Sequence, residues 1–337
     1  MRAVGYQVPG PITAEASLVD IELPVPETHG RDLLVAVKAV SVNPVDTKIR
    51  KRAGPEAGDW KVLGWDCAGT VVAAGPDALS FKPGDDVFYA GAIGRPGSNS
   101  EFQLVDERIV GRKPSTIGFA EAAAIPLTAV TAWETLFDRL DVRRPVPGVT
   151  PAILIIGGAG GVGSIAIQLA RRLTDLVVIA TASRPETVEW VRAMGAHHVI
   201  DHSKPLAAQV AGLGIGAPPF VFSTTNTDQH IGEIAELIAP QGRFALIDDP
   251  GVVDIAAFKT KSVSVHWELM YTRTIFETAD MAEQGMLLNE VASLVDDGTL
   301  RTTLTETLGP INAANLKRAH TLLESGRTIG KVVLEGF

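Results

Sequence analysis

A regular alternation of short apolar runs and longer amphipathic segments in the middle of the chain constrains the fold most. Six apolar runs, spaced 20 to 23 residues apart, begin at Ile153, Leu176, His198, Phe220, Arg243 and Val263. A β-strand, a crossover helix and two loops need about that length. The pattern therefore predicts five successive βαβ units, which form a six-stranded parallel sheet in an α/β fold.

The segments on either side of the apolar runs support this interpretation. Residues 162–173 carry apolar side chains at three- and four-residue steps, which is typical of a helix packed on a sheet. Residues 1–125 instead contain short β-branched runs separated by turns, and they predict a mostly antiparallel β domain, such as a barrel. Residues 280–296 and 313–324 are expected to be helical, and residues 331–334 could form a strand that returns to the first domain.

Composition excludes several classes of protein. The 337 residues are enough for about two domains, and a formal charge of −9 argues against a nucleic-acid or anionic-membrane partner. The one cysteine, Cys67, excludes an intramolecular disulfide and a four-cysteine zinc site. No signal peptide or membrane-spanning run is visible, so the protein is expected to be soluble and cytoplasmic.

A glycine-rich turn follows the first of these strands and precedes a predicted helix. Glycines allow a tight turn and a close approach to a pyrophosphate, and the helix N-terminus offers unpaired N–H groups. A glycine-rich string can also be a plain loop, but its place in a βαβ series favours dinucleotide binding. The predicted cofactor-binding residues here are Gly158, Ala159, Gly160, Gly161 and Val162.

The ends of later strands supply further cofactor candidates. The second strand ends in Ser183 and Arg184 without an acidic residue, which suits the 2′-phosphate of NADPH better than the ribose of NADH. Arg184 could also be only a solvated charge. Because ligands of such sheets lie beyond the carboxyl ends of the strands, the other candidates are Ser223, Thr224, Ile247 and Asp248. The hydroxyl residues could equally be helix caps.

Five segments along the chain form a recognisable set: Gly64–Gly69 (GWDCAG), Phe81–Val87 (FKPGDDV), Ala159–Gly163 (AGGVG), Gly195–Asp201 (GAHHVID) and Gly330–Leu334 (GKVVL). In these segments the chain resembles the medium-chain dehydrogenase/reductase superfamily, and within it the quinone oxidoreductase branch, especially the group called zinc-binding alcohol dehydrogenase-like. The resemblance covers nearly the whole chain. It implies a GroES-like β-barrel catalytic domain at 1–125, a Rossmann doubly wound domain at 126–266, and a helical segment with a return strand at 267–337.

The same resemblance suggests residues for the active site. The segment Ser41–Arg50 is similar to the active-site segment of zinc-free quinone reductases, which implies Asn43 as donor to the substrate oxygen and Asp46 as its positioning partner. Lys48 stands where relatives often have tyrosine, and it is a candidate proton donor or an exposed surface residue. Thr131 matches a position on the nicotinamide side, and family members are often homodimers.

The residues that should bind zinc are absent. Zinc-dependent members of the superfamily have cysteine where this chain has Asn43 and histidine where it has Trp65, and their third ligand falls near Pro126 or Leu127. None of these residues is an ordinary zinc ligand, so no metal site is predicted. The histidines at 197, 198 and 202 lack ligand spacing, and His202 is expected near the adenosine.

Without a Lewis acid, hydride delivery to a simple ketone loses charge stabilisation, whereas conjugated acceptors spread the charge themselves. The sequence therefore favours a zinc-independent, NADPH-dependent reductase that acts on a small electrophile, either a quinone or an α,β-unsaturated carbonyl. Two alternatives stay open. One is a zinc-dependent alcohol dehydrogenase with unusual ligands, and the other is a non-catalytic NADPH-binding sensor.

Overall fold

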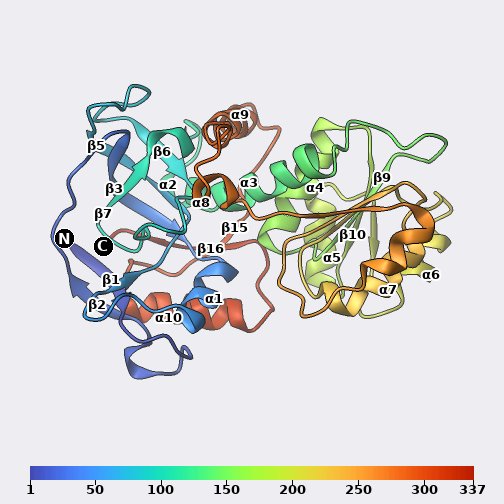
Figure 1. Cartoon of the computed structure of the whole chain (residues 1–337), viewed down its shortest axis with the longest axis horizontal. Coiled ribbons are helices and arrows are strands. Elements are labelled where there is room, and N and C mark those ends of the chain that lie inside the picture. Colours follow the sequence, from blue (N-terminus) through green and yellow to red (C-terminus); the bar gives the residue numbers. More distant parts are fainter. The chain divides into compact units, whose positions relative to one another are not determined.

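The computed structural model describes all residues, 1–337, and the chain forms two compact units (Figure 1). The first, here called the β unit, comprises Met1–Val130 and Tyr271–Phe337. The second, the nucleotide unit, comprises Thr131–Met270. The predicted domain boundaries at residues 125 and 266 lie a few residues before these changes of unit.

The nucleotide unit contains the predicted six-stranded parallel sheet. Its strand order is β11-β10-β9-β12-β13-β14, in which the first strand along the chain lies in the middle. This is the order of a Rossmann fold, and it leaves a switch point between β9 and β12 where nucleotides bind in such sheets. The strands are β9 (Ala152–Ile156), β10 (Val177–Thr181), β11 (His198–Ile200), β12 (Phe220–Ser223), β13 (Arg243–Leu246) and β14 (Ser264–Trp267).

Helices connect these strands and bury their apolar faces on the sheet. The core includes fully buried aliphatic side chains and the stacked rings of Phe244 and Phe258, whose centroids are 5.5 Å apart. Gly195 ends α5 in the left-handed region, at φ 116°. The helices are α4 (Gly161–Leu173), α5 (Pro185–Met194), α6 (Leu206–Gly212) and α7 (Thr227–Leu237), with the π-helix η3 (Glu134–Arg139) and the 3₁₀ helix η4 (Ile255–Lys261).

The β unit is mostly antiparallel, as expected. One sheet has the order β2-β1-β4, and a seven-stranded sheet has the order β15-β16-β3-β5-β6-β8, with β7 also paired to β3. The strands are β1 (Arg2–Tyr6), β2 (Val19–Glu22), β3 (Asp32–Ser41), β4 (Lys61–Val62), β5 (Cys67–Ala74), β6 (Asp86–Tyr89), β7 (Phe102–Asp106), β8 (Val110–Arg112), β15 (Leu304–Thr307) and β16 (Lys331–Glu335). The predicted return strand is β16, which pairs with β3.

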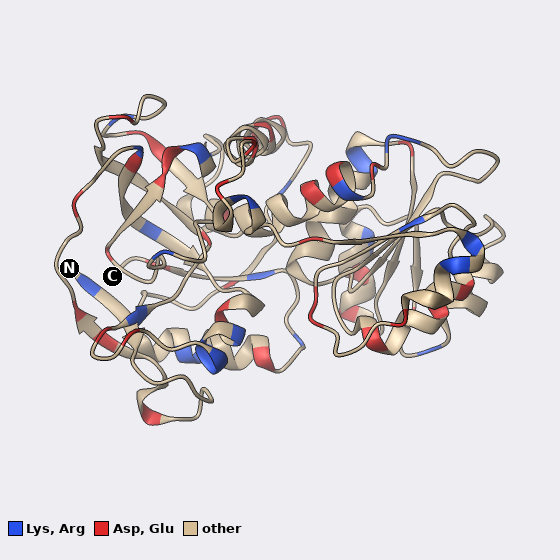
Figure 2. Ribbon diagram, in the orientation of Figure 1, with Lys and Arg blue, Asp and Glu red and all other residues tan.

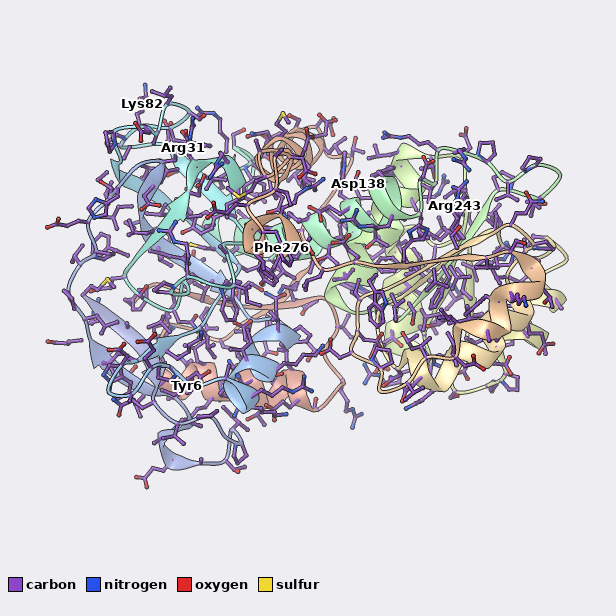
Figure 3. The ribbon with its side chains drawn as sticks, in the orientation of Figure 1. Tyr6, Arg31, Lys82, Asp138, Arg243 and Phe276 are labelled. Atoms are coloured by element: carbon purple, nitrogen blue, oxygen red, sulfur yellow. The ribbon has the colours of Figure 1, made fainter.

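Short helices complete the β unit. Tyr6 lies beside α1, and its phenol donates a hydrogen bond of 2.6 Å to the carbonyl oxygen of Ala53 at the end of that helix (Figure 3). The α-helices are α1 (Pro44–Arg52), α2 (Phe119–Ala123), α8 (Thr272–Ile275), α9 (Glu283–Asp296) and α10 (Ala313–Glu324), with α3 (Pro126–Trp133) passing from one unit to the other. The 3₁₀ helices are η1 (Glu15–Ser17) and η2 (Glu107–Ile109).

Charged residues of both signs are interspersed over the two units (Figure 2). No helix of the structure combines the length and the apolar character that a membrane span requires.

Candidate active site

The glycine-rich turn joins β9 to α4 at the middle of the parallel sheet. Gly157 has φ 80° and donates its N–H to the Thr181 hydroxyl at 3.0 Å, so the turn is tied to the end of the neighbouring strand β10. A side chain at Gly157 would collide with Thr224, and one at Gly163 would lie 2.8 Å from the Cα of Gly158. Glycine is therefore required at both positions by the fold itself.

Gly160 differs from these two glycines. It is the N-cap of α4 with φ −72° and ψ 173°, a conformation open to any residue. A Cβ there would meet only the Gly157 carbonyl oxygen, at 3.6 Å. The N–H groups of Gly161, Val162 and Gly163 lie in the first turn of α4, where a helix offers no backbone acceptor. These N–H donors suit the pyrophosphate of a dinucleotide. When a nicotinamide dinucleotide is bound, its nicotinamide supplies or accepts a hydride.

Thr181 also joins the turn to His202, which lies after β11. Its hydroxyl is 3.2 Å from Nδ1 of His202. Burial lowers the pKa of His202, the Asp201 carboxylate raises it, and the positive charge of Arg184 lowers it, so the His202 imidazole and the Arg184 guanidinium lie near each other. The Nε of Arg184 is also 3.0 Å from the Glu186 carboxylate. The structure thus brings together the predicted residues Arg184 and His202 at one end of the glycine-rich turn.

Other predicted cofactor residues already have partners within the nucleotide unit. The Ser223 hydroxyl is 2.8 Å from the hydroxyl of Thr227, the first residue of α7. The N–H and the hydroxyl of Thr227 both donate to the Asp248 carboxylate. The Thr224 hydroxyl donates to the Ile156 carbonyl at 2.8 Å. Asp248 thus accepts an N–H group at the start of α7, whereas neither Ser223 nor Thr224 caps this helix, so the helix-cap alternative is wrong for these two hydroxyls. Two further candidates form hydrogen bonds through their backbone. Ile247 donates its N–H to the Ser223 carbonyl, and the Thr131 carbonyl accepts a hydrogen bond from the Thr135 hydroxyl.

A buried polar cluster in the β unit contains two of the predicted catalytic residues. Asn43, Asp46, Asp66 and Lys331 are each at most 4 % exposed. The Lys331 ammonium lies 3.0 Å from Asp66 Oδ2 and donates to Asn43 Oδ1 at 2.5 Å and to the Val42 carbonyl at 3.0 Å. Asn43 Nδ2 donates to the same Asp66 oxygen at 2.8 Å. The amide of Asn43 is thus held between a carboxylate and an ammonium.

Asp46 fixes the start of α1 beside this cluster. One carboxylate oxygen accepts the N–H of Asn43 at 2.6 Å, and the other accepts that of Gly64 at 3.0 Å. Burial raises the pKa of Asp46 to about 7, because desolvation of the carboxylate outweighs these hydrogen bonds. Asp46 thus holds the backbone of Asn43 at the start of α1. The amide N–H groups of Asn43 donate to Asp66 and to the Ser41 carbonyl, so its predicted role as donor to the substrate oxygen is not seen in the structure. Lys48 is half-buried farther along the same helix.

The donor set at this place does not suit a zinc ion. Asn43 is an amide, and the indole N–H of Trp65 donates to the Ala92 carbonyl at 3.2 Å. Leu127 contributes only its backbone N–H, to Asp66 at 2.8 Å. Burial raises the pKa of the Cys67 thiol to about 12, and the thiol lies beside the Tyr89 phenol. No group of three or more His, Cys, Asp or Glu side chains is arranged to hold a metal ion.

Sequence reasoning did not select Lys331 of this cluster, or Tyr271 beside it, as site residues. Lys331 was assigned only to a strand, although a lysine in a buried strand signals a charged partner, because isolated buried charges are costly. Tyr271 is 2 % exposed, and its ring lies edge-on to Trp65 with the centroids 6.4 Å apart. The sequence signal for Tyr271 was weak, because nothing local links it to residues 43–66.

The nucleotide unit holds a second buried polar pair, Glu134 and Glu268, just beyond the end of β14. Glu268 is 3 % exposed and receives a hydrogen bond of 2.7 Å from Arg139 Nε. Burial, and then the neighbouring carboxyl of Glu134, raises the pKa of Glu268 to about 8. Glu268 therefore holds its proton more tightly in the folded protein than in the unfolded chain.

We expect Glu268→Gln to flatten the dependence of stability on pH. The folded-state pKa lies above the ordinary value of 4.5, so the wild-type protein loses stability as pH rises from about 4.5 through about 8. Glutamine keeps the shape of the protonated carboxyl and does not titrate. Urea unfolding at several pH values measures this, with the exposed Glu189→Gln as control. Equal slopes for wild type and Glu268→Gln would contradict the raised pKa of Glu268.

Comparisons with known proteins identify the family. Two sequence families match: the alcohol dehydrogenase GroES-like domain over residues 29–134, and a zinc-binding dehydrogenase family over residues 194–334. A zinc-type alcohol dehydrogenase-like protein of Staphylococcus aureus is 41% identical, with 99% of both chains aligned. A crystal structure from Rhizobium etli, provisionally named a zinc-dependent alcohol dehydrogenase protein, is 69% identical with a TM-score of 0.99, covering 100% of this chain and 98% of that one.

Two other relatives carry the names of reductases. The 2-methylene-furan-3-one reductase of Solanum lycopersicum is 28% identical over 99% of this chain and 79% of its own. A quinone oxidoreductase structure from Pseudomonas syringae is 25% identical with a TM-score of 0.83, over 99% of both chains. The chain therefore belongs to the zinc-binding alcohol dehydrogenase-like group of the medium-chain dehydrogenase/reductase superfamily, whose members are nicotinamide-dependent oxidoreductases.

Proposed function

We propose that this oxidoreductase reduces a quinone or an α,β-unsaturated carbonyl with NADPH and without zinc. The observation that carries the proposal is the cluster at the zinc-ligand positions, where Asn43 is bound by Asp66 and Lys331 and no group of three metal-binding side chains is present. The names of the tomato and Pseudomonas syringae relatives support the same substrate classes.

The chemistry follows from the missing Lewis acid. Reduction of an isolated ketone concentrates charge on one oxygen, which a metal ion stabilises by several kcal/mol. In an enone or a quinone, the arriving electron pair is delocalised over the conjugated system, so neutral hydrogen-bond donors are sufficient. The protein's part is then to orient the acceptor, exclude water and place donors at the oxygen.

An acceptor screen on protein prepared without added metal tests the proposal. We expect NADPH consumption with 2-cyclohexenone or 1,4-benzoquinone, and none with acetaldehyde. Metal-dependent oxidation of ethanol as the dominant activity, or near-stoichiometric bound zinc, would establish the alternative of a zinc enzyme. NADPH binding without consumption of any electrophile would instead establish a sensor.

Arg184→Glu should reduce the preference for NADPH over NADH. A charge-assisted hydrogen bond contributes about 1.5–3 kcal/mol, so the ratio of the two Kd values should change by about 10- to 100-fold. Fluorescence titration with each cofactor measures the ratio. Arg192→Glu makes the same charge change near the other end of α5 and serves as control. An unchanged ratio in Arg184→Glu would remove Arg184 from the 2′-phosphate site.

A further inference from the structure

Tyr271 carries a buried hydrogen-bond donor that nothing in the protein accepts. It is the first residue after the chain leaves the nucleotide unit, and it is held by its carbonyl oxygen, which accepts the N–H of Ile275 in α8 at 2.8 Å. The phenol oxygen is buried and has no hydrogen-bond partner. An unsatisfied buried hydroxyl costs free energy, so its presence needs a functional explanation.

The surroundings of the phenol keep it in its donor form. Burial raises the pKa of Tyr271 well above 10, and the carboxylates of Asp46 and Asp66 raise it further. These carboxylates are not its acceptors, because the Tyr271 phenol oxygen has no hydrogen-bond partner. Tyr271 thus stays protonated beside the cluster.

The phenol also lies next to the residue that replaces a zinc ligand. Its ring meets the Trp65 ring edge-on, at an interplanar angle of 72°. The indole N–H of Trp65 is directed to the Ala92 carbonyl, so it is not the donor for an added molecule. Among the side chains named here around Asp46, Asp66 and Trp65, Tyr271 is therefore the donor that remains for an added molecule.

We propose that Tyr271 is a catalytic residue that donates its phenol hydrogen bond to the carbonyl oxygen of the substrate. The inference rests on the proposed function and names the group that replaces the metal. As a hydride from NADPH joins the β-carbon of the enone, the C=C electron pair shifts and negative charge gathers on the carbonyl oxygen. The Tyr271 hydrogen bond stabilises this charge, and a proton from water then completes the α-carbon.

Tyr271→Phe tests the proposal by removing one oxygen atom. We expect kcat with 2-cyclohexenone to fall by about 10²- to 10³-fold, as when one oxyanion donor is removed. The Kd for NADPH should not change. The variant should withstand urea at least as well as wild type, because the lost hydroxyl has no partner. Lower activity combined with undiminished stability is not what a structural role predicts.

Tyr89→Phe is the matched control. The Tyr89 phenol is equally buried, but it faces the Cys67 thiol rather than the carboxylates, so its removal should leave kcat unchanged. If wild type is active and Tyr271→Phe matches it, the role of Tyr271 is wrong while the proposed function stands.

A binding measurement separates the remaining case. If wild type reduces no electrophile, the proposed function fails. Calorimetric titration of 2-cyclohexenone into wild type and into Tyr271→Phe, each with NADP⁺ present, then tests whether Tyr271 is the donor. Binding about tenfold weaker in Tyr271→Phe than in wild type supports the donor, and equal binding, or none to either protein, overturns it.

Discussion

Lys331→Met should destabilise the β unit by about 3–5 kcal/mol, the usual cost of leaving one partner of a buried ion pair without the other. The substitution keeps the length of the side chain but removes the ammonium that lies 3.0 Å from Asp66. It also leaves the oxygens of Asn43 and Val42 without their donor. Urea unfolding at pH 7 measures the loss.

Two variants and a pH series test the cause. Lys38→Met changes an exposed lysine and should shift stability by less than about 0.5 kcal/mol. Lys331→Met combined with Asp66→Asn should recover most of the loss, because neither charge is then buried. Burial raises the pKa of Asp66, so the folded state holds its proton more tightly and the deficit of Lys331→Met should shrink as pH falls. A deficit that is independent of pH would contradict this explanation.

Gly160→Val should abolish useful cofactor binding in a protein that still folds. The valine Cβ has room in the turn and an allowed backbone conformation, but its methyl groups fill the space beside the N–H groups of α4. The loss of two hydrogen bonds to phosphate corresponds to a Kd about 100-fold or more higher. Fluorescence titration with NADPH measures it.

Gly163→Ala provides the contrast within the same turn. Its Cβ would lie 2.8 Å from the Cα of Gly158 and collide with the Gly157 carbonyl oxygen, so this variant should be destabilised. The two substitutions thus separate binding from folding. Tight NADPH binding by a folded Gly160→Val protein would place the pyrophosphate elsewhere.

The nucleotide unit could be predicted closely because its signals are local. The spacing of the apolar runs reproduced the six strands to within one residue at their starts. Each of these signals lies within about 25 residues of chain. The Gly-rich turn is equally local, since β9, the turn and α4 are consecutive.

The polar cluster could be predicted only in part, for the opposite reason. Asn43 and Asp46 were found through a resemblance and are three residues apart. Lys331 contacts Asn43 across 288 residues of sequence. Tyr271 lies in the turn between β14 and α8, where the sequence has no periodic pattern of apolar residues. One sequence does not say which distant residue neutralises a buried carboxylate, because any lysine or arginine satisfies the same electrostatic need.

The pairing of β16 with β3 has a consequence for synthesis on the ribosome. The Ser41 hydroxyl donates to the Val332 carbonyl, 291 residues later, whereas residues 131–270 form an uninterrupted unit. The inserted unit can therefore acquire its structure while the first 130 residues still wait for their closing strand. The sheet of the β segment can close only once translation has passed residue 335, because β16 is the strand that pairs with β3.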